Sequence, residues 1–255
     1  MICICAIAKN EEDYLQEWIE HHLKIGFDFI VLYDNNDNNK QEEICKKYQQ
    51  VLYVKFKEKQ YAAYNHFLKH FGEDFDYIAF IDIDEFIVFN PDQPIQNIKD
   101  FINKTNREYY HFSWMVMDDN DLVYKDDRPV MERFTRPLKK FDYGNFNFPV
   151  NFHVKSLIKY NKNLKSTHSH YFNCGYKCYN CDNEEVDGNS PVMYPNHNVC
   201  YIKHFLTKSA EEYRNNKMSR LRCDLNIEYY TISVFFKYNT FTEEKYKVLK
   251  ETKSS

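Results

Sequence analysis

The stretch Tyr77–Val88 (YIAFIDIDEFIV) carries the residues of this chain that are best suited to chemistry. Two aspartates, Asp82 and Asp84, stand one residue apart, and Glu85 follows them. Apolar residues flank the acids on both sides, which predicts a buried strand. Residues i and i+2 of a strand point to the same side. We therefore expect Asp82 and Asp84 to share one face, or to meet where the strand gives way to a loop.

Two close carboxylates repel each other unless a positive charge lies between them. Mg²⁺ or Mn²⁺ is suited to this place, because these ions prefer carboxylate oxygens and tend to keep phosphates as their other ligands. The alternative is a solvated acidic cluster at a strand end, although such a cluster needs no apolar flanks. Asp82 and Asp84 are thus the predicted site for a metal ion and a phosphate-bearing substrate.

Composition limits the class of protein. The chain has 255 residues, of which 43% are hydrophobic and 28% charged, and its formal net charge is −4. These values are typical of a globular domain and differ from those of a disordered chain or a basic nucleic-acid binder. The start, MICICAIAKNEE, has no signal-peptide pattern, and no run reaches the ~20 apolar residues of a membrane span. We expect a cytoplasmic protein with mostly free thiols and no nucleic-acid partner.

Strands and helices are predicted to alternate before residue 90, which favours an α/β fold with a mostly parallel sheet and helices on both faces. The predicted strands are Ile2–Ala8, Phe27–Tyr33, Val51–Phe56 and Tyr77–Ile83, and the predicted helices are Leu15–Leu23, Glu42–Tyr48 and Tyr61–Phe71. Ligands of such sheets bind at the carboxyl ends of the strands. Polar segments follow every one of these strands: Lys9–Asp13, Asp34–Asn39, Lys57–Gln60 and Asp82–Glu85.

The second part of the chain has a weaker pattern, without an internal repeat or a linker. We predict one domain over residues 1–255, with a nucleotide-binding half at about 1–90, an acceptor half at about 91–222 and C-terminal helices at about 207–250. The predicted helices of this part are Ile95–Ile102, Pro129–Phe134, Lys208–Arg222 and Asp224–Lys237. Its predicted strands are Tyr109–Val116, Val154–Tyr160, Thr167–Phe172 and Cys200–Phe205. We expect Cys174–Asn198 to be irregular.

Several segments form an ordered series that resembles one known family group. They are KNE (Lys9–Glu11), EWIEHH (Glu17–His22), LYDN (Leu32–Asn35), FIDIDEF (Phe80–Phe86) and HFLTKSAEEYRNNK (His204–Lys217). The series is similar to glycosyltransferases of the GT-A fold, in the family-2-like group close to family 92. The resemblance covers roughly residues 1–90 well and 150–220 in patches. It implies inverting transfer of a sugar from a nucleotide sugar, UDP-linked or GDP-linked with UDP favoured, to a glycan or lipid-linked acceptor hydroxyl in surface-glycan or glycoconjugate synthesis.

The resemblance also implies roles for individual residues on the donor side. Asp82 and Asp84 match the metal-binding DxD motif, with one acid holding Mn²⁺ or Mg²⁺ directly, and His204 is the candidate third ligand or else a core histidine. Lys208 opens a helix, where a lysine and backbone N–H groups both favour phosphate. The remaining donor-side candidates are Lys9, Asn10, Glu11, Gln60 and Asp34, and Asp34 is an equally good candidate for a turn residue.

The acceptor side is less certain in its pattern. An inverting reaction needs a base, and Asp119 and Glu132 are the two candidates, each of which is otherwise a solvated acid. Family 92 carries a Trp-x-x-Phe-Gly segment where this chain has WMVMDD (Trp114–Asp119), although ERF (Glu132–Phe134) is similar. Peripheral membrane contact through the C-terminal helices stays open, because a helix that packs on the core has the same pattern.

Two further alternatives concern metal and function. Cys174, Cys178 and Cys181 have nearby cysteine and histidine residues that could complete a zinc site, but the spacing is not a paired CxxC pattern and free thiols are the simpler interpretation. A HAD-type phosphatase also has DxD after an apolar strand, but its motif follows the first strand of the fold. An inactive glycan-binding or nucleotide-binding module is the third hypothesis.

Overall fold

The computed structural model describes residues 1–138, 150–219 and 229–251, and the chain divides into two compact units. The first unit comprises Met1–Met115 and Asp142–Lys203, and the second comprises Val116–Phe141 and His204–Ser255. The assignment of residues 1–255 to one domain stays a prediction.

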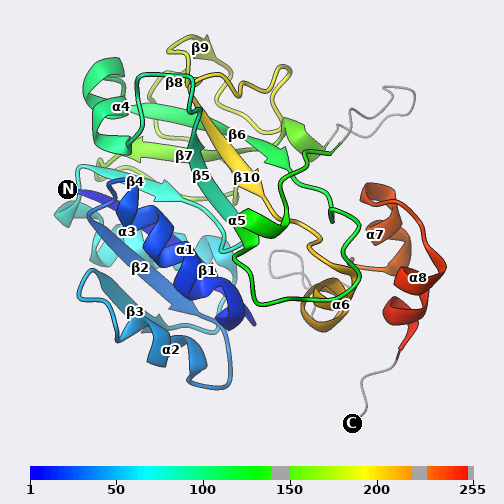
Figure 1. Ribbon diagram of the computed structural model, residues 1–255. Coiled ribbons are helices and arrows are strands. Elements are labelled where there is room, and N and C mark those ends of the chain that lie inside the picture. Colours follow the sequence, from blue (N-terminus) through cyan, green and yellow to red (C-terminus); the bar gives the residue numbers. More distant parts are fainter. Residues whose placement is uncertain (139–149, 220–228, 252–255) are drawn as a thin grey trace. The chain divides into compact units, whose positions relative to one another are not determined.

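The first unit is built on a mixed sheet with the strand order β3-β2-β1-β4-β7-β6-β10-β5 (Figure 1). β3, β2, β1 and β4 run parallel, and β7 is antiparallel to both β4 and β6. The α/β fold class is thereby confirmed, with its parallel part in the N-terminal half. The strands are β1 Ile2–Ala8, β2 Phe29–Asp34, β3 Val51–Lys55, β4 Tyr77–Phe80, β5 Glu85–Phe89, β6 Tyr109–Val116, β7 Val154–Lys159, β8 Cys178–Tyr179, β9 Glu185–Val186 and β10 Cys200–His204.

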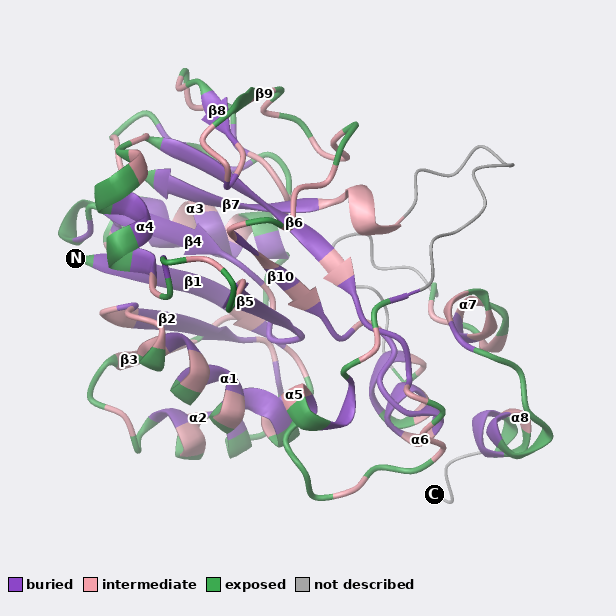
Figure 2. Ribbon diagram, turned by 45° about the horizontal axis from the view of Figure 1, so that its top comes forward, coloured by how far each residue is buried: buried purple, intermediate pink, exposed green. Residues whose placement is uncertain are grey.

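Helices cover both faces of the parallel part of this sheet, because successive strand residues point to opposite sides. On one face, residues of β1, β2 and β4 form a core with Tyr64 and Phe67 of α3 (Gln60–His70). α1 (Glu12–Lys24) and α2 (Lys40–Cys45) lie on the other face. The strands between these layers are buried along most of their length (Figure 2). Such burial on both faces explains why the strands read as continuous apolar runs.

The acids of FIDIDEF do not lie within a strand. β4 ends at Phe80 and β5 begins at Glu85, so residues 81–84 form a turn, and the backbone N–H of Glu85 donates to the carbonyl of Asp82 at 3.2 Å. We call residues 81–84 the DxD turn. The prediction of a strand through Ile83 was wrong in extent, and the second alternative, in which both acids lie where a strand gives way to a loop, is the observed one.

Further predictions for the first unit need correction. The segment Cys174–Asn198, which was expected to be irregular, contains the short antiparallel pair of β8 and β9, so this prediction was wrong in part. α4 (Ile98–Thr105) begins three residues later than predicted, because Asn97 caps it by accepting a hydrogen bond from the N–H of Asp100. The segment Thr167–Phe172 is not a strand. It forms a single bridge between Ser166 and Phe172, and the His170 side chain bonds the carbonyl of Val154 instead.

The second unit is a small helical assembly. Its core contains Ala210, Tyr213, Phe235 and Val248. The helices are α5 Val130–Arg133, α6 Ala210–Glu212 with a π-helical turn at Tyr213–Lys217, α7 Ile232–Tyr238 and α8 Glu243–Lys250. The predicted helices Lys208–Arg222 and Asp224–Lys237 were therefore too long, because the structure has α6 with its π-helical turn in place of the first and α7 in place of the second. Residues 220–228 of these two predictions lie outside the described part of the chain. α8 follows Thr242, whose hydroxyl caps it, and the sequence pattern did not predict it. No helix in the described ranges is long and apolar enough to cross a membrane.

Candidate active site

The DxD turn lies at the carboxyl end of β4, where Asp82 is held by two side chains. The amide nitrogen of Gln60, the first residue of α3, donates to Oδ1 of Asp82. The ammonium of Lys155, from β7, lies 2.8 Å from Oδ2 of Asp82. The structure therefore brings two predicted site residues, Asp82 and Gln60, into direct contact. It also gives each oxygen of the Asp82 carboxylate a donor.

Glu85 fixes the turn from inside and is completely buried. Its carboxylate accepts a hydrogen bond from the backbone N–H of Asp82 at 2.9 Å, and its second partner is Lys155 at 3.7 Å. Asp84 is only 4% exposed. The neighbouring Ile81 and Ile83 are buried, which anchors the turn in the core. These contacts explain why the acids need the apolar flanks that mark the sequence.

The segment EWIEHH supports the same turn from α1. The indole N–H of Trp18 donates to the carbonyls of Asp82 at 3.1 Å and Glu85 at 2.8 Å. His22 lies between helix and strand, with Nδ1 2.8 Å from the carbonyl of Trp18 and Nε2 3.2 Å from the backbone N–H of Ile87 in β5. Because the Ile87 N–H must donate to Nε2, His22 is neutral and carries its proton on Nδ1. The motif thus positions the turn through backbone hydrogen bonds.

A pH effect on stability follows from His22. Burial, and then the neighbouring His21, hold the pKa of His22 well below its ordinary value of 6.5. The unfolded chain therefore binds a proton below pH 6.5 that the folded chain does not bind, and the free energy of unfolding must fall as the pH drops through this range. Relative to a His22→Asn variant, the wild type should lose up to about 2 kcal/mol between pH 6.5 and pH 5.

Urea unfolding followed by tryptophan fluorescence checks this, since Trp18 adjoins His22. His70→Asn, at an exposed histidine of α3, is the matched control and should keep the pH slope of the wild type. Equal slopes for the wild type and His22→Asn would contradict the neutral-histidine assignment.

The loops after β1 and β2 meet at the same edge of the sheet as the DxD turn. Lys9, Asn10 and Glu11 follow β1, and the backbone N–H of Asn10 donates to the side chain of Asn36 at 2.8 Å. Asn10 has φ 56°, a left-handed conformation that asparagine adopts more readily than most residues. The KNE segment is therefore locked to the Asn-rich loop that follows β2. Its part in nucleotide binding stays a prediction.

Asp34, the last residue of β2, is completely buried and organises the Asn-rich loop. Its carboxylate accepts hydrogen bonds from the N–H of Asn36 at 2.8 Å, the hydroxyl of Tyr53 at 2.7 Å, the ammonium of Lys55 at 3.0 Å and the amide of Gln41. Four internal donors favour the turn-residue alternative over contact with a base. A role for Asp34 in base binding stays a prediction.

The residues of the DxD turn fit a hard divalent cation on the chemistry of their donors. The turn supplies the carboxylates of Asp82 and Asp84, and Mg²⁺ characteristically takes one or two carboxylates and completes its shell with water and substrate phosphates. Both oxygens of Asp82 already accept from internal donors, and which of the two acids binds a cation directly stays a prediction.

The cysteines do not assemble a zinc site within residues 1–138, 150–219 and 229–251, where no group of three or more histidine, cysteine or acidic side chains is arranged to hold a metal ion. Cys178, Cys181 and Cys200 are buried as free thiols, and Cys174 is half-buried. Burial, as the largest cause, raises the pKa of Cys174 and of Cys178. Whether these cysteines bind zinc or remain free thiols stays a prediction.

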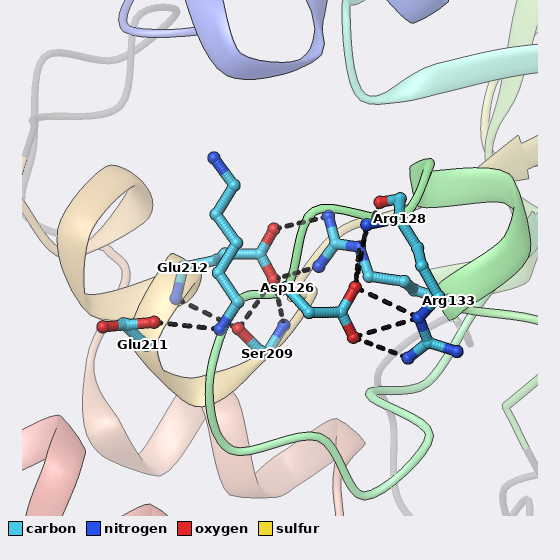
Figure 3. A network of polar contacts seen from close by, with 7 residues as sticks. Asp126, Arg128, Arg133, Ser209, Glu211 and Glu212 are labelled. Atoms are coloured by element: carbon cyan, nitrogen blue, oxygen red, sulfur yellow. Dashed lines mark hydrogen bonds and ion pairs between the residues drawn. The ribbon is translucent and has the colours of Figure 1, made fainter.

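In the second unit, the segment HFLTKSAEEY builds a polar network with ERF (Figure 3). Ser209 and Glu212 form a capping box at the start of α6. The Glu212 carboxylate also accepts hydrogen bonds from both terminal nitrogens of Arg133, at 2.8 and 2.9 Å. Burial by itself raises the pKa of Glu212, but the hydrogen bonds from Arg133 and Ser209 outweigh burial and lower it. These two segments therefore have a structural role in common.

The predicted ligands of the second unit have well-defined places. Lys208 is 4% exposed and has φ 57°. The N–H of Ser209, which we predicted to favour phosphate, donates to Glu212 at 3.1 Å instead. His204 ends β10, is 4% exposed, and its carbonyl accepts from the N–H of Met117 at 3.0 Å. The roles of Lys208 and His204 toward phosphate and metal stay predictions.

The two candidate bases differ in environment. Asp119 is fully buried and its carboxylate lies 2.6 Å from the ammonium of Lys245 in α8. Burial raises the pKa of Asp119 more than Lys245 lowers it. Glu132 lies on α5 and is exposed. A raised pKa suits a general base, whereas exposure leaves Glu132 in the solvated state. Neither role is tested by these contacts.

Three residues that make ion pairs or hydrogen bonds at these sites were not identified as site residues from the sequence. Lys155 and Arg133 provide the buried cations for Asp82 and Glu212, and Trp18 binds the backbone of the DxD turn. A signal existed for Lys155, because it is a charged residue in the predicted strand Val154–Tyr160, where a buried ion is costly unless it is paired. Arg133 and Trp18 stood in segments that resembled the family without an assigned role.

Two plant proteins of glycosyltransferase family 92 are similar to part of this chain. A glycosyltransferase family 92 protein of Oryza sativa subsp. japonica is 31% identical over 103 residues, which cover 38% of this chain and 18% of the rice protein. A family 92 protein of Arabidopsis thaliana is 32% identical over 94 residues, or 34% of this chain and 16% of that protein. The chain thus matches less than a fifth of each plant relative.

A longer match exists in an archaeon. A protein of Methanocaldococcus jannaschii, named an uncharacterized glycosyltransferase, is 26% identical over 250 residues, which cover 92% of this chain and 78% of that protein. Among solved structures, HddC from Yersinia pseudotuberculosis aligns with a TM-score of 0.38 and 11% identity over 62% of this chain and 77% of that chain, a level too low to indicate function. The family model described as glycosyltransferase family 92 matches residues 1–228, and this chain therefore belongs to glycosyltransferase family 92.

Proposed function

We propose that this chain is a metal-dependent glycosyltransferase that moves a sugar from a nucleotide-sugar donor to an acceptor hydroxyl. The observation that carries the proposal is the DxD turn, which is fixed by α1, α3 and β7 at the carboxyl end of a parallel strand. Family membership supports the same class of reaction. An aspartate pair held at this edge of an α/β sheet suits a diphosphate and its cation.

The chain's own residues divide the work as follows in this proposal. Asp84 holds the cation, which when bound would neutralise the diphosphate leaving group. Asp82 is kept in place by Gln60 and Lys155, and the loops after β1 and β2 receive the nucleoside. The proposed donor is a UDP-sugar, and the proposed acceptor is a glycan or a lipid-linked molecule. We propose that the reaction inverts the anomeric centre and takes place in the cytoplasm, with peripheral contact of the protein with the membrane.

A thermal-shift panel of UDP, GDP and CMP sugars, each with and without Mn²⁺, tests it. A ligand that binds only the folded state raises the free energy of unfolding, by about 2.7 kcal/mol when its concentration is a hundred times its dissociation constant. The melting temperature rises as a result. We expect one nucleotide class to shift the melting temperature only when Mn²⁺ is present. A shift that is the same with and without the metal would refute metal dependence. A specific Mn²⁺-dependent shift without sugar transfer would identify an inactive binding module.

A further inference from the structure

Lys155 is a buried cation inside the candidate active site, and the proposed function gives it no role beyond the support of Asp82. Its side chain is 0% exposed. Its ammonium lies 2.8 Å from Asp82, 3.7 Å from Glu85 and 3.4 Å from the carbonyl of Ser169. An ammonium ion is strongly destabilised in the interior unless it is paired, so these carboxylates must hold it there.

The register of the sheet accounts for this position. β7 runs antiparallel to β4, and the last pair of the two strands is Phe80 with Ser156. Lys155 is one step beyond that pair, beside the point at which β4 gives way to the DxD turn. A residue at this place can reach the turn from beneath, as the ion pair with Asp82 shows.

Charge is the property that Lys155 adds to the turn. Without a cation beside them, Asp82 and Asp84 would give a negatively charged site, and such a site would bind a free divalent cation whether or not a donor is present. A fixed ammonium beside Asp82 and Glu85 repels a second cation in the same place. A donor brings the negative charge of its diphosphate, which offsets that repulsion.

We propose that Lys155 is a positioning residue that holds Asp82 in an ion pair and weakens the binding of a free divalent cation. Cation binding then depends on the donor diphosphate. The inference rests on the proposed function and adds one property to it. The metal ion binds together with a nucleoside diphosphate and is not held permanently by the protein.

Titration of the full chain with MnCl2, with free Mn²⁺ followed by electron paramagnetic resonance, tests this without an activity readout. Lys155→Met should bind Mn²⁺ alone about tenfold or more tightly than the wild type, because a buried positive charge near the site has been removed. Added UDP should tighten Mn²⁺ binding in the wild type by a larger factor than in the variant. Lys159→Met, at an exposed lysine of the same strand, is the matched control and should leave both affinities unchanged.

A folded Lys155→Met variant whose affinity for Mn²⁺ equals or falls below that of the wild type overturns the inference. If Lys155→Met does not fold, the pair Asp82→Asn and Asp82→Asn/Lys155→Met decides instead, since the double variant has lost both partners of the ion pair. The double variant must then bind Mn²⁺ more tightly than Asp82→Asn, and equal affinities overturn the inference. Failure of the proposed function is a separate result, namely a wild type without any Mn²⁺-dependent shift in the nucleotide-sugar panel.

Discussion

Replacing Asp84 with asparagine should abolish Mn²⁺-dependent binding of the nucleotide sugar and reduce transfer activity by at least about a hundredfold, the scale of losing one main electrostatic contact to a reacting group. The reason lies in the DxD turn, where both oxygens of Asp82 are engaged by Gln60 and Lys155. Asp84 is the carboxylate to which the proposed function assigns the direct bond to the cation. Asparagine keeps the size of the side chain, so the fold should persist.

Isothermal titration with the nucleotide sugar and Mn²⁺, alongside circular dichroism, measures binding and fold separately. Asp74→Asn is a suitable control, because Asp74 is an exposed acid that precedes the amino end of β4, away from the turn. Unchanged metal-dependent binding in a folded Asp84→Asn variant would remove the metal role from this residue.

The largest loss of stability is expected from Arg133→Met. Arg133 and Glu212 form a bidentate ion pair in which both side chains are 2% exposed. Removing the arginine leaves a buried carboxylate without its cation, which typically costs about 3–5 kcal/mol. The free energy of unfolding of the second unit should fall by that amount. Arg128→Met, at an arginine that is 57% exposed and paired with Asp126, should cost no more than about 1 kcal/mol.

Urea unfolding followed by circular dichroism is the appropriate measurement, because both tryptophans, Trp18 and Trp114, belong to the first unit. The double variant Arg133→Met/Glu212→Gln provides the sharper test. Glutamine keeps the capping contact with Ser209 while removing the buried charge, so this variant should recover a large part of the lost stability. A double variant as unstable as Arg133→Met alone would show that packing, and not the unpaired charge, causes the loss.

The sequence by itself determined the parallel half of the fold and the place of its chemistry. Apolar runs at intervals predicted β1 in full and the first residue of β3 and of β4, because strands that are covered by helices are apolar along most of their length. The segment FIDIDEF then identified the acidic turn, since Asp82 and Asp84 follow a buried strand at the ligand-binding edge. Gln60, predicted on the donor side, contacts Asp82 of that turn, and its part in nucleotide binding stays a prediction.

Only the tertiary structure decided which partners these residues have. The cation beside Asp82 comes from Lys155, 73 positions away in the sequence, and Glu212 is paired with Arg133, 79 positions away. The sequence left Asp34 equally suited to base binding and to a turn, and only the structure shows the four internal donors by which it supports a loop. Thr167–Phe172 alternates like a strand but bonds through side chains. Periodicity reports which residues are buried, whereas the partner of a buried charge depends on strand order and register, and these are properties of the folded chain.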